Sequence, residues 1–333
     1  ELRAFIMVDV LFKNSSYVAT DLKDTLYEIM DGAGGERIQP GASVLIKPNF
    51  LIPAAPERAI TTHPLVVKAV AEYVLDKGAK PVVADSPGMG SFEKILGKGG
   101  YLDATGGLDV VFRPFRESVS VDIGEPFGVI SLAREAIQSD LVINLAKLKT
   151  HAQMLLTMGV KNMFGCVIGL KKPEWHLKAG RDRTIFARLL VQICRAVSPA
   201  ITIVDGITAL EGQGPGKSGT PRQLGLIAGS RNPFALDMTL CKVLGLDPDK
   251  LHTHRVAREL GLLPEHINLK GTFHVLEDFV FPDIGPMTLG PKMLHGFMRR
   301  NILQKPVVDN KACKLCGECW KYCPVKAITH SIK

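Results

Sequence analysis

The chain has 333 residues, of which 46% are hydrophobic and 22% are charged, and its formal net charge is +8. This length and composition fit a folded protein with one large α/β domain, or two lobes, and a small additional module, and they exclude a disordered chain. No run of about eighteen apolar residues occurs, so we expect no membrane span.

Strands alternate with helices along the first part of the chain. The apolar run Ser43–Ile46 leads into Lys47, as expected for a buried strand that ends in a loop. Pro64 opens a helix with apolar residues at helical spacing, and Gly78 ends it. The next strand is Pro81–Asp85. A strand, a crossover helix and a second strand form a βαβ unit, which predicts a parallel sheet.

Later segments extend this alternation. Strands are expected at residues 109–112, 141–145, 201–204 and 224–228, and helices at residues 184–196 and 233–244. The predicted fold class is therefore α/β, with a mainly parallel sheet flanked by helices and a small C-terminal ferredoxin-like cluster module. We assign residues 1–290 to the α/β domain, as one unit or two lobes. Residues 291–333 form the module, and its completeness at the C-terminus stays open.

Polar residues gather where the predicted strands end. In an open parallel sheet, ligands bind outside the carboxyl ends of the strands. The polar residues at or just after those ends are Lys47, Asn49, Asp85, Ser86, Asn144, Lys147, Lys149, His151 and Asp205. Strand ends are commonly polar, but several lysines together with Asp and His predict a site. The candidate cofactor-binding residues are Lys47, Asn49, Asp85, Ser86 and Asn162.

A basic segment follows the strand expected at residues 141–145. Between Lys147 and Arg183, eight Lys or Arg residues face only Glu174 and Asp182. Lysine suits a phosphate or a carboxylate, so the segment predicts an anionic small molecule as the ligand. A solvated basic face is the alternative. The candidates for anion binding and proton transfer are Lys147, Lys149, His151 and Lys161, the first three at alternating positions and so on one side of an expected loop. Lys171, Lys172, His176, Arg181 and Arg183 extend this set.

A second basic stretch lies near the C-terminal end of the sequence. From Lys292 to Lys333, nine Lys or Arg residues face only Asp309 and Glu318. This charge favours an acidic redox partner protein. Nucleic acid is not expected, because aromatic residues make up only 6% of the chain and do not alternate with the basic residues as stacking platforms would. The sequence leaves the formation of a homo-oligomer open.

Two other features have simple structural explanations. Residues 211–218 (EGQGPGKS) lack the first glycine of a phosphate-binding P-loop and precede a strand, so we interpret them as a glycine-rich lid loop. The isolated cysteines are expected to be buried apolar residues, although cluster ligation by the first of them is the alternative. They are Cys166, Cys194 and Cys241.

The most specific motif lies in the last part of the chain. Cys313, Cys316, Cys319 and Cys323 have C-x₂-C-x₂-C-x₃-C spacing, and Pro324 follows directly. This is the ligand run of a bacterial-type ferredoxin site. A zinc site would normally pair two C-x₂-C units or add histidines. A disulfide pair would leave two thiols unused. We therefore predict a 4Fe–4S cluster as the cofactor.

The motif does not fix the fourth ligand of the cluster. In two-cluster ferredoxins the fourth cysteine of such a run ligates the other cluster. The ligand can therefore come from Cys323, from Cys166 or another isolated cysteine, from a further motif or from a partner chain. One cluster is expected, and a second if another motif or a partner completes it.

Five short motifs precede the cysteine run in a characteristic order. They are Lys47-Pro48-Asn49, Thr61-Thr62-His63-Pro64, Lys147-Leu148-Lys149-Thr150-His151, Lys161-Asn162-Met163-Phe164-Gly165 and Glu211-Gly212-Gln213-Gly214-Pro215. Over about residues 40–330 the chain thereby resembles the bacterial and archaeal iron–sulfur family known as domain of unknown function 362. The resemblance implies an α/β domain fused to a ferredoxin-like module, and no established reaction. Members of the family often carry two cluster motifs, whereas this chain shows one.

Three interpretations of function remain. In the first, the protein is a redox protein, such as an iron–sulfur oxidoreductase, whose cluster passes single electrons to chemistry on an anionic small molecule in the α/β domain. In the second, it is a non-enzymatic electron-transfer or assembly partner that docks on an acidic protein. In the third, the cluster has a purely structural role. The cysteine usage favours a reducing, cytoplasmic setting.

Overall fold

The structure is a computed structural model that describes residues 7–169, 171–179, 182–284, 313–314 and 316–317. The strands are β1 (Met7–Asn14), β2 (Ser43–Lys47), β3 (Lys80–Asp85), β4 (Val111–Pro114), β5 (Ser118–Asp122), β6 (Val129–Ala133), β7 (Leu141–His151), β8 (Leu155–Thr157), β9 (Ile201–Gly212), β10 (Gly219–Ser230) and β11 (His266–Lys270). The helices are α1 (Ala19–Gly32), α2 (Pro64–Asp76), α3 (Phe92–Gly99), α4 (Tyr101–Ala104), α5 (Arg134–Gln138), α6 (Gly159–Asn162), α7 (Lys171–Ala179), α8 (Arg183–Val197), α9 (Pro233–Val243) and α10 (His252–Glu259).

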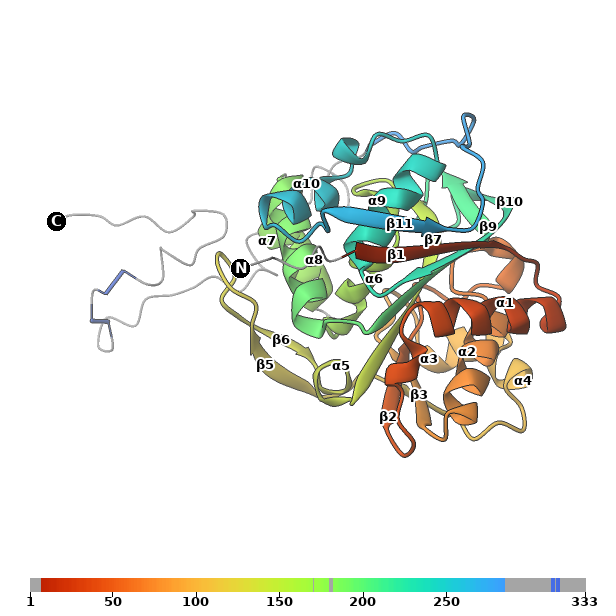
Figure 1. Cartoon of the computed structure of the whole chain (residues 1–333). Helices are drawn as coiled ribbons and strands as arrows, with labels where there is room; N and C mark the ends of the chain where they lie inside the picture. Colours follow the sequence, from red (N-terminus) through yellow and green to blue (C-terminus); the bar gives the residue numbers. More distant parts are fainter. Residues whose placement is uncertain (1–6, 170, 180–181, 285–312, 315, 318–333) are drawn as a thin grey trace, which may run out of the picture.

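One mixed sheet forms the centre of the described part of the chain (Figure 1). Eight of its nine strands lie side by side in the order β11-β1-β10-β9-β7-β2-β3-β4. The ninth strand, β8, pairs with β7 outside this order. The neighbours from β4 to β9 run parallel, whereas β10 is antiparallel to both β9 and β1. The predicted α/β class with a mainly parallel sheet is confirmed. The carboxyl ends of β2, β3, β7 and β9 consequently meet at one edge.

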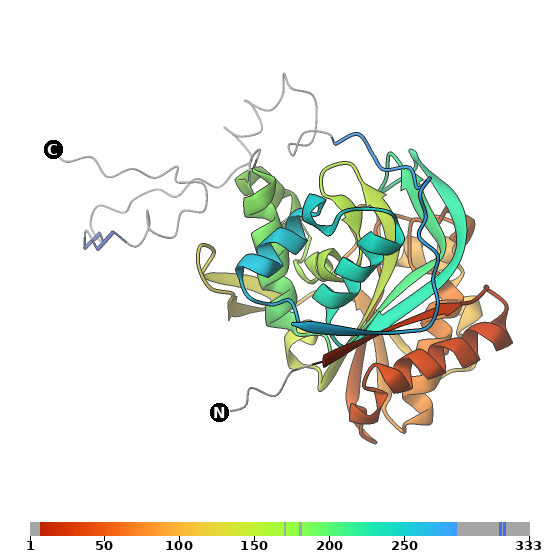
Figure 2. The same cartoon turned by 45° about the horizontal axis from the view of Figure 1, so that its top comes forward.

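Helices cover both faces of the sheet, which explains its contiguous apolar runs. In β2, Val44 and Ile46 pack in the same core as α1 and α2, whereas Leu45 packs in the core that contains α8. All three side chains are fully buried, as expected for a parallel strand between two helical layers. Figure 2 shows these layers from a second direction, with α1 and α2 on one side of the sheet and α8, α9 and α10 on the other.

Local sequence signals locate several elements correctly. The helices predicted at residues 184–196 and 233–244 correspond to α8 and α9, which begin after the capping side chains of Asp182 and Asn232. The helix predicted from Pro64 is α2. β2 and β3 each lie within one residue of the predicted range.

Other elements differ from the sequence predictions. β7 continues to His151, so Lys147, Lys149 and His151 lie in a strand and not in a loop. The reason is tertiary: β9 extends the parallel pairing past Lys147, and β8 pairs with the last three residues of β7. β4 begins two residues later than predicted, at Val111. β1, β11 and α1 had no counterpart in the predictions.

The predicted boundary between residues 290 and 291 lies outside the described residues, so the division into domains stays a prediction. Among the helices of the described part, none is both long and apolar enough to cross a membrane.

Candidate functional site

The carboxyl ends of β2, β3 and β7 border a small, partly open cavity of about 80 Å³. A volume of this size corresponds to roughly two or three water molecules. The lining includes Lys47, Asn49, Phe50, Leu51, Asp85, Ser86, Gly88, Lys149, His151, Thr157, Lys161, Asn162, Phe164, Gly165, Lys172 and Pro215. Among these described lining residues, four are lysines and one, Asp85, is a carboxylate. The cavity is therefore rich in positive charge.

A buried ion pair holds the loops after β2 and β3 together. Lys47 Nζ lies 2.9 Å from Asp85 Oδ1, and both side chains are buried. The same carboxylate accepts hydrogen bonds from the backbone N–H groups of Phe50, at 2.9 Å, and Ser86, at 2.8 Å. A buried charge is tolerated only when a counter-charge and hydrogen bonds compensate its lost hydration. This carboxylate is therefore committed to Lys47 and the backbone.

A chain of amide groups supports Lys149. Its Nζ donates to Asn49 Oδ1 at 2.6 Å and to the carbonyl oxygen of Ile60 at 2.5 Å. Asn49 Nδ2 in turn donates to Asn162 Oδ1 at 2.8 Å, and Asn162 Nδ2 donates to Asn144 Oδ1 at 2.7 Å. Both acceptors of Lys149 are uncharged. Burial therefore lowers the pKa of Lys149 well below its ordinary value.

Lys161 and Lys172 bring two more amines to the cavity. Lys161, on α6, has no hydrogen-bond or ion-pair partner among the described residues. Lys172, on α7, donates to the carbonyl oxygen of Ser86. Burial lowers the pKa of each lysine to about 8, and the charge of Lys172 adds to this effect at Lys161. Both amines consequently titrate close to physiological pH.

Two neutral side chains of the lining have unused hydrogen-bonding groups. His151 Nδ1 accepts from the backbone N–H groups of Gln153 and Met154, at 3.2 and 3.3 Å. Burial, helped by the charge of Lys161, lowers the pKa of His151 well below its ordinary value, so the ring is neutral and carries its proton on Nε2. Thr157 Oγ1 is buried and has no hydrogen-bond partner in the described structure. An unpaired buried hydroxyl is rare, and it indicates a place for a polar ligand atom or water.

The cavity brings together most of the candidate residues named from the sequence. Those in the lining are Lys47, Asn49, Asp85, Ser86, Lys149, His151, Lys161 and Asn162. Their roles in binding or catalysis stay predictions. Lys172 joins them from the extended set, whereas Lys171 is exposed and His176 packs on Phe164 and Phe186.

Thr157 and Pro215 are among the lining residues that were not named as site candidates from the sequence. Thr157 lies in the short strand β8, which no local pattern indicated. Pro215 lies in the stretch at residues 211–218 that the sequence predicted as a lid loop, and its place in the lining shows that this segment reaches the cavity, although Glu211 and Gly212 still belong to β9.

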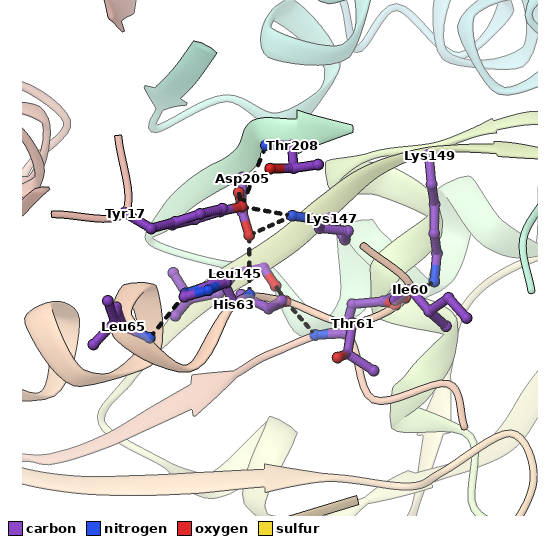
Figure 3. A network of polar contacts seen from close by, with 12 residues as sticks. Tyr17, Ile60, Thr61, His63, Leu65, Leu145, Lys147, Lys149, Asp205 and Thr208 are labelled. Atoms are coloured by element: carbon purple, nitrogen blue, oxygen red, sulfur yellow. Dashed lines mark hydrogen bonds and ion pairs between the residues drawn. The ribbon is translucent and has the colours of Figure 1, made fainter. Parts of the chain in front are cut away.

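Lys147 lies outside the cavity lining and belongs to a second buried cluster (Figure 3). Its Nζ lies 2.8 Å from Asp205 Oδ2 and 2.9 Å from Tyr17 OH. Tyr17 OH donates to Asp205 Oδ1 at 2.7 Å, and the Tyr17 ring stacks on His63 with centroids 3.6 Å apart. The backbone N–H of His63 donates to Asp205 as well. This cluster ties the loop after β1 and the start of α2 to the paired middle parts of β7 and β9.

The cysteine run lies mostly outside the described residues. Cys313 and Cys316 are exposed, whereas Cys319 and Cys323 are not among the described positions. Four thiols at this spacing are the donor set that a 4Fe–4S cluster requires. The three other cysteines are buried in the α/β domain. Within the described ranges, no three His, Cys, Asp or Glu side chains lie close enough to hold a metal ion.

Comparisons with known families agree with these two parts of the chain. The model of the family described as a domain of unknown function (DUF362) matches residues 44–242, and that of a 4Fe-4S binding domain matches residues 306–329. The protein is therefore an iron–sulfur protein with an α/β domain and a 4Fe–4S cluster-binding segment. It belongs to the DUF362 family. The predicted resemblance and the predicted cofactor are confirmed.

Similar proteins extend over most of the chain. The thylakoid-associated protein sll1697 of Synechocystis sp. is 42% identical over 256 residues, which cover 76% of this chain and 79% of that protein. Among solved structures, the lactate racemase apoprotein from Thermoanaerobacterium thermosaccharolyticum aligns with a TM-score of 0.46 and 10% identity over 68% of this chain. A protein from Thermotoga maritima aligns with a TM-score of 0.40 and 14% identity over 63%. The chain spans 54% of the length of each of these two structures.

Replacing Asp205 by asparagine is expected to lower the free energy of unfolding by about 3–5 kcal/mol, because Lys147 would keep a buried charge without a carboxylate. Urea unfolding measures the difference. The matched control is Glu28→Gln, since Glu28 pairs with Lys13 at the surface, where the two side chains are 61% and 40% exposed. The control should cost less than about 1 kcal/mol. Equal losses in the two variants would contradict a structural role for the Lys147–Asp205 pair.

Replacing Gly165 by alanine is expected to distort the ion pair beside the cavity. A Cβ atom there would lie 2.4 Å from both Asp85 Oδ1 and Lys47 Nζ. We expect a loss of about 1–3 kcal/mol of stability in thermal or urea unfolding, as for an overpacked core. Gly97→Ala on α3 is the control, because a Cβ at that position meets nothing within 4 Å. The Gly97 control should be neutral or stabilise the helix by up to about 1 kcal/mol. A Gly165 variant as stable as this control would refute the close packing around the ion pair.

Proposed function

We propose that the protein couples one-electron transfer through its 4Fe–4S cluster to chemistry on a small anionic molecule bound in the lysine-rich cavity. The match to a 4Fe-4S binding domain supports the electron-transfer part. One observation carries the anion part: in the described lining, four lysines accompany a single carboxylate, which is already paired with Lys47. A bound cluster would accept and donate single electrons.

The energetics of the lysines support an anion as the missing partner. Moving an ammonium group out of water costs several kcal/mol unless a counter-charge compensates it. Lys149 contacts only neutral acceptors, and Lys161 has no partner in the described structure. A phosphate, sulfate or carboxylate group would supply both negative charge and acceptor oxygens. The unpaired hydroxyl of Thr157 could donate to the same ligand.

The form of the site favours chemistry over simple docking. An electron-transfer partner that only docks on an acidic protein needs an open basic surface. The lysines described here instead surround a small cavity together with His151, whose neutral ring can donate or accept a proton. The docking and purely structural interpretations stay predictions, as do an acidic partner protein, a homo-oligomer and a cytoplasmic location.

Anion binding is expected to weaken as the pH rises through about 8. Lys161 and Lys172 have pKa values of about 8, so both are mostly charged at pH 7 and mostly neutral at pH 9. Sulfate keeps its charge over this range, and calorimetric titration should show its affinity falling roughly 10- to 100-fold, for one or two required ammonium groups. His151 is neutral throughout.

The control for this experiment is Lys161→Met, which should bind sulfate more weakly at pH 7 and show a smaller change between pH 7 and pH 9. Lys171→Met, at an exposed neighbouring position, should behave like the unchanged protein. Binding that is absent at pH 7, or equally strong at both pH values, would refute the anion site.

Cys316→Ser is expected to abolish or strongly reduce cluster incorporation, because serine does not replace a thiolate ligand of iron well. Anaerobic purification, iron and sulfide analysis, and electron paramagnetic resonance before and after dithionite reduction measure this loss. Cys194→Ala is the matched control, since Cys194 is buried on α8 and should leave the iron content unchanged. Full iron content in the Cys316 variant would contradict the ligand assignment.

A further inference from the structure

Lys161 differs from the other lysines of the cavity in its lack of an acceptor. Lys47 pairs with Asp85, Lys149 donates to Asn49 and to a backbone carbonyl, and Lys172 donates to another backbone carbonyl. Lys161 has no such contact among the described residues, although it lies in the lining beside these amines. A lysine whose only task was to neutralise a carboxylate or cap a strand end would be paired with that group. Its amine is available to a ligand.

The surroundings of Lys161 also keep part of its amine unprotonated. Burial and the nearby charge of Lys172 lower its pKa to about 8. At pH 7, roughly a tenth of such amines are neutral, compared with about 0.03% for a lysine at the ordinary pKa. Desolvation and a neighbouring cation are the two means by which proteins activate a lysine as a nucleophile toward carbonyl groups.

We propose that Lys161 forms an imine with a short anionic carbonyl compound, a carboxylate of two or three carbons that carries an aldehyde or ketone group, held in the lysine-rich cavity. The inference rests on the proposed function in one respect, because the same cavity must bind the carboxylate. It goes beyond that function by naming the substrate class and a covalent step.

The bond changes balance without any oxidant or reductant. The lone pair of neutral Lys161 Nζ attacks the carbonyl carbon, a C–N bond forms, and the C=O π electrons move to the oxygen, which takes up a proton. The nitrogen, which is cationic after the attack, releases one proton to give a neutral amino alcohol. The hydroxyl oxygen then takes up a second proton and leaves as water, the nitrogen lone pair forms the C=N bond, and the nitrogen releases its second proton. Overall, one amine and one carbonyl group give one imine and one water molecule.

Other groups of the cavity suit this reaction. Lys149 and Lys172 are amines that can donate hydrogen bonds to the carboxylate, and Lys172, with a pKa of about 8, is mostly charged at pH 7. The Nε2 proton of neutral His151 and the unpaired hydroxyl of Thr157 are hydrogen-bond donors available to the carbonyl oxygen as it becomes an alcohol and then water. The volume of about 80 Å³ limits the ligand to a few non-hydrogen atoms.

Reductive trapping tests the proposal on the full chain with its cluster, under anaerobic conditions. The protein is treated with glyoxylate or pyruvate and cyanoborohydride, and peptide mass spectrometry measures the alkylated amine at each lysine. At pH 7 we expect Lys161 to be modified at least tenfold faster than the exposed Lys171. The rate should pass through a maximum near pH 8, because Lys161 must be neutral to react while Lys172 must be charged to hold the carboxylate. Sulfate should slow the modification of Lys161 and leave that of Lys171 unchanged. Lys161→Arg should remove the fast site.

The outcomes separate this inference from the proposed function. If sulfate binds in calorimetry but Lys161 is modified no faster than Lys171, the imine is refuted and the anion site stands. If sulfate neither binds nor protects, and no lysine reacts fast, both ideas fail. Fast modification of Lys161 that sulfate does not slow would refute a carbonyl compound bound in this cavity. The Lys161→Arg variant is checked for an unchanged unfolding transition, so that loss of the fast site is not loss of the fold.

Discussion

The buried ion pair between Lys47 and Asp85 is the contact on which the rest of the site depends. The carboxylate joins the loop after β2 to the end of β3, since it also accepts two backbone N–H groups there. Gly165 approaches this pair so closely that no side chain fits between. Asp85 is the one carboxylate of the described lining and it is paired with Lys47, so the other three lysines of the cavity have no carboxylate partner, although the Asp85 charge still acts on Lys149 and Lys172. The cavity has a local excess of positive charge because Asp85, the one carboxylate of its described lining, is already paired with Lys47.

Local patterns in the sequence predict the fold of the protein better than they predict the residues around the cavity. Val44, Leu45 and Ile46 are apolar and buried on both faces, so β2 could be recognised from a short run alone. The end of β7 could not be recognised in this way, because Lys147, Lys149 and His151 are polar residues that normally mark a loop or a solvent-facing strand. They are buried because β8 and β9 pair alongside them, and this pairing involves residues up to 61 positions away, as between Lys149 and Leu210.

The cluster site and the cavity were predictable to different degrees, and the distance between their residues along the sequence explains the difference. The cluster ligands lie within eleven residues, from Cys313 to Cys323, so their spacing alone defines the donor set. The cavity combines residues from Lys47 to Pro215, and no spacing rule relates them. Thr157 could be placed in the lining only from the three-dimensional structure. Lys147 looked equivalent to Lys149 in the sequence, but its partner Asp205 is visible only once β7 and β9 are paired.

The long sequence separations between hydrogen-bonded residues also limit the order in which the cavity can form. Asn49 and Lys149 are 100 positions apart, Asn49 and Asn162 are 113 apart, and Tyr17 and Asp205 are 188 apart. A growing polypeptide leaves the ribosome from its N-terminus, and contacts between distant residues form only after the entropy of long loop closure has been overcome. Lys47 and Asp85 can meet early, in the first β-α-β unit. The lining as a whole extends to Pro215, so a nascent chain that ends before this residue can contain the Lys47–Asp85 pair but not the complete cavity.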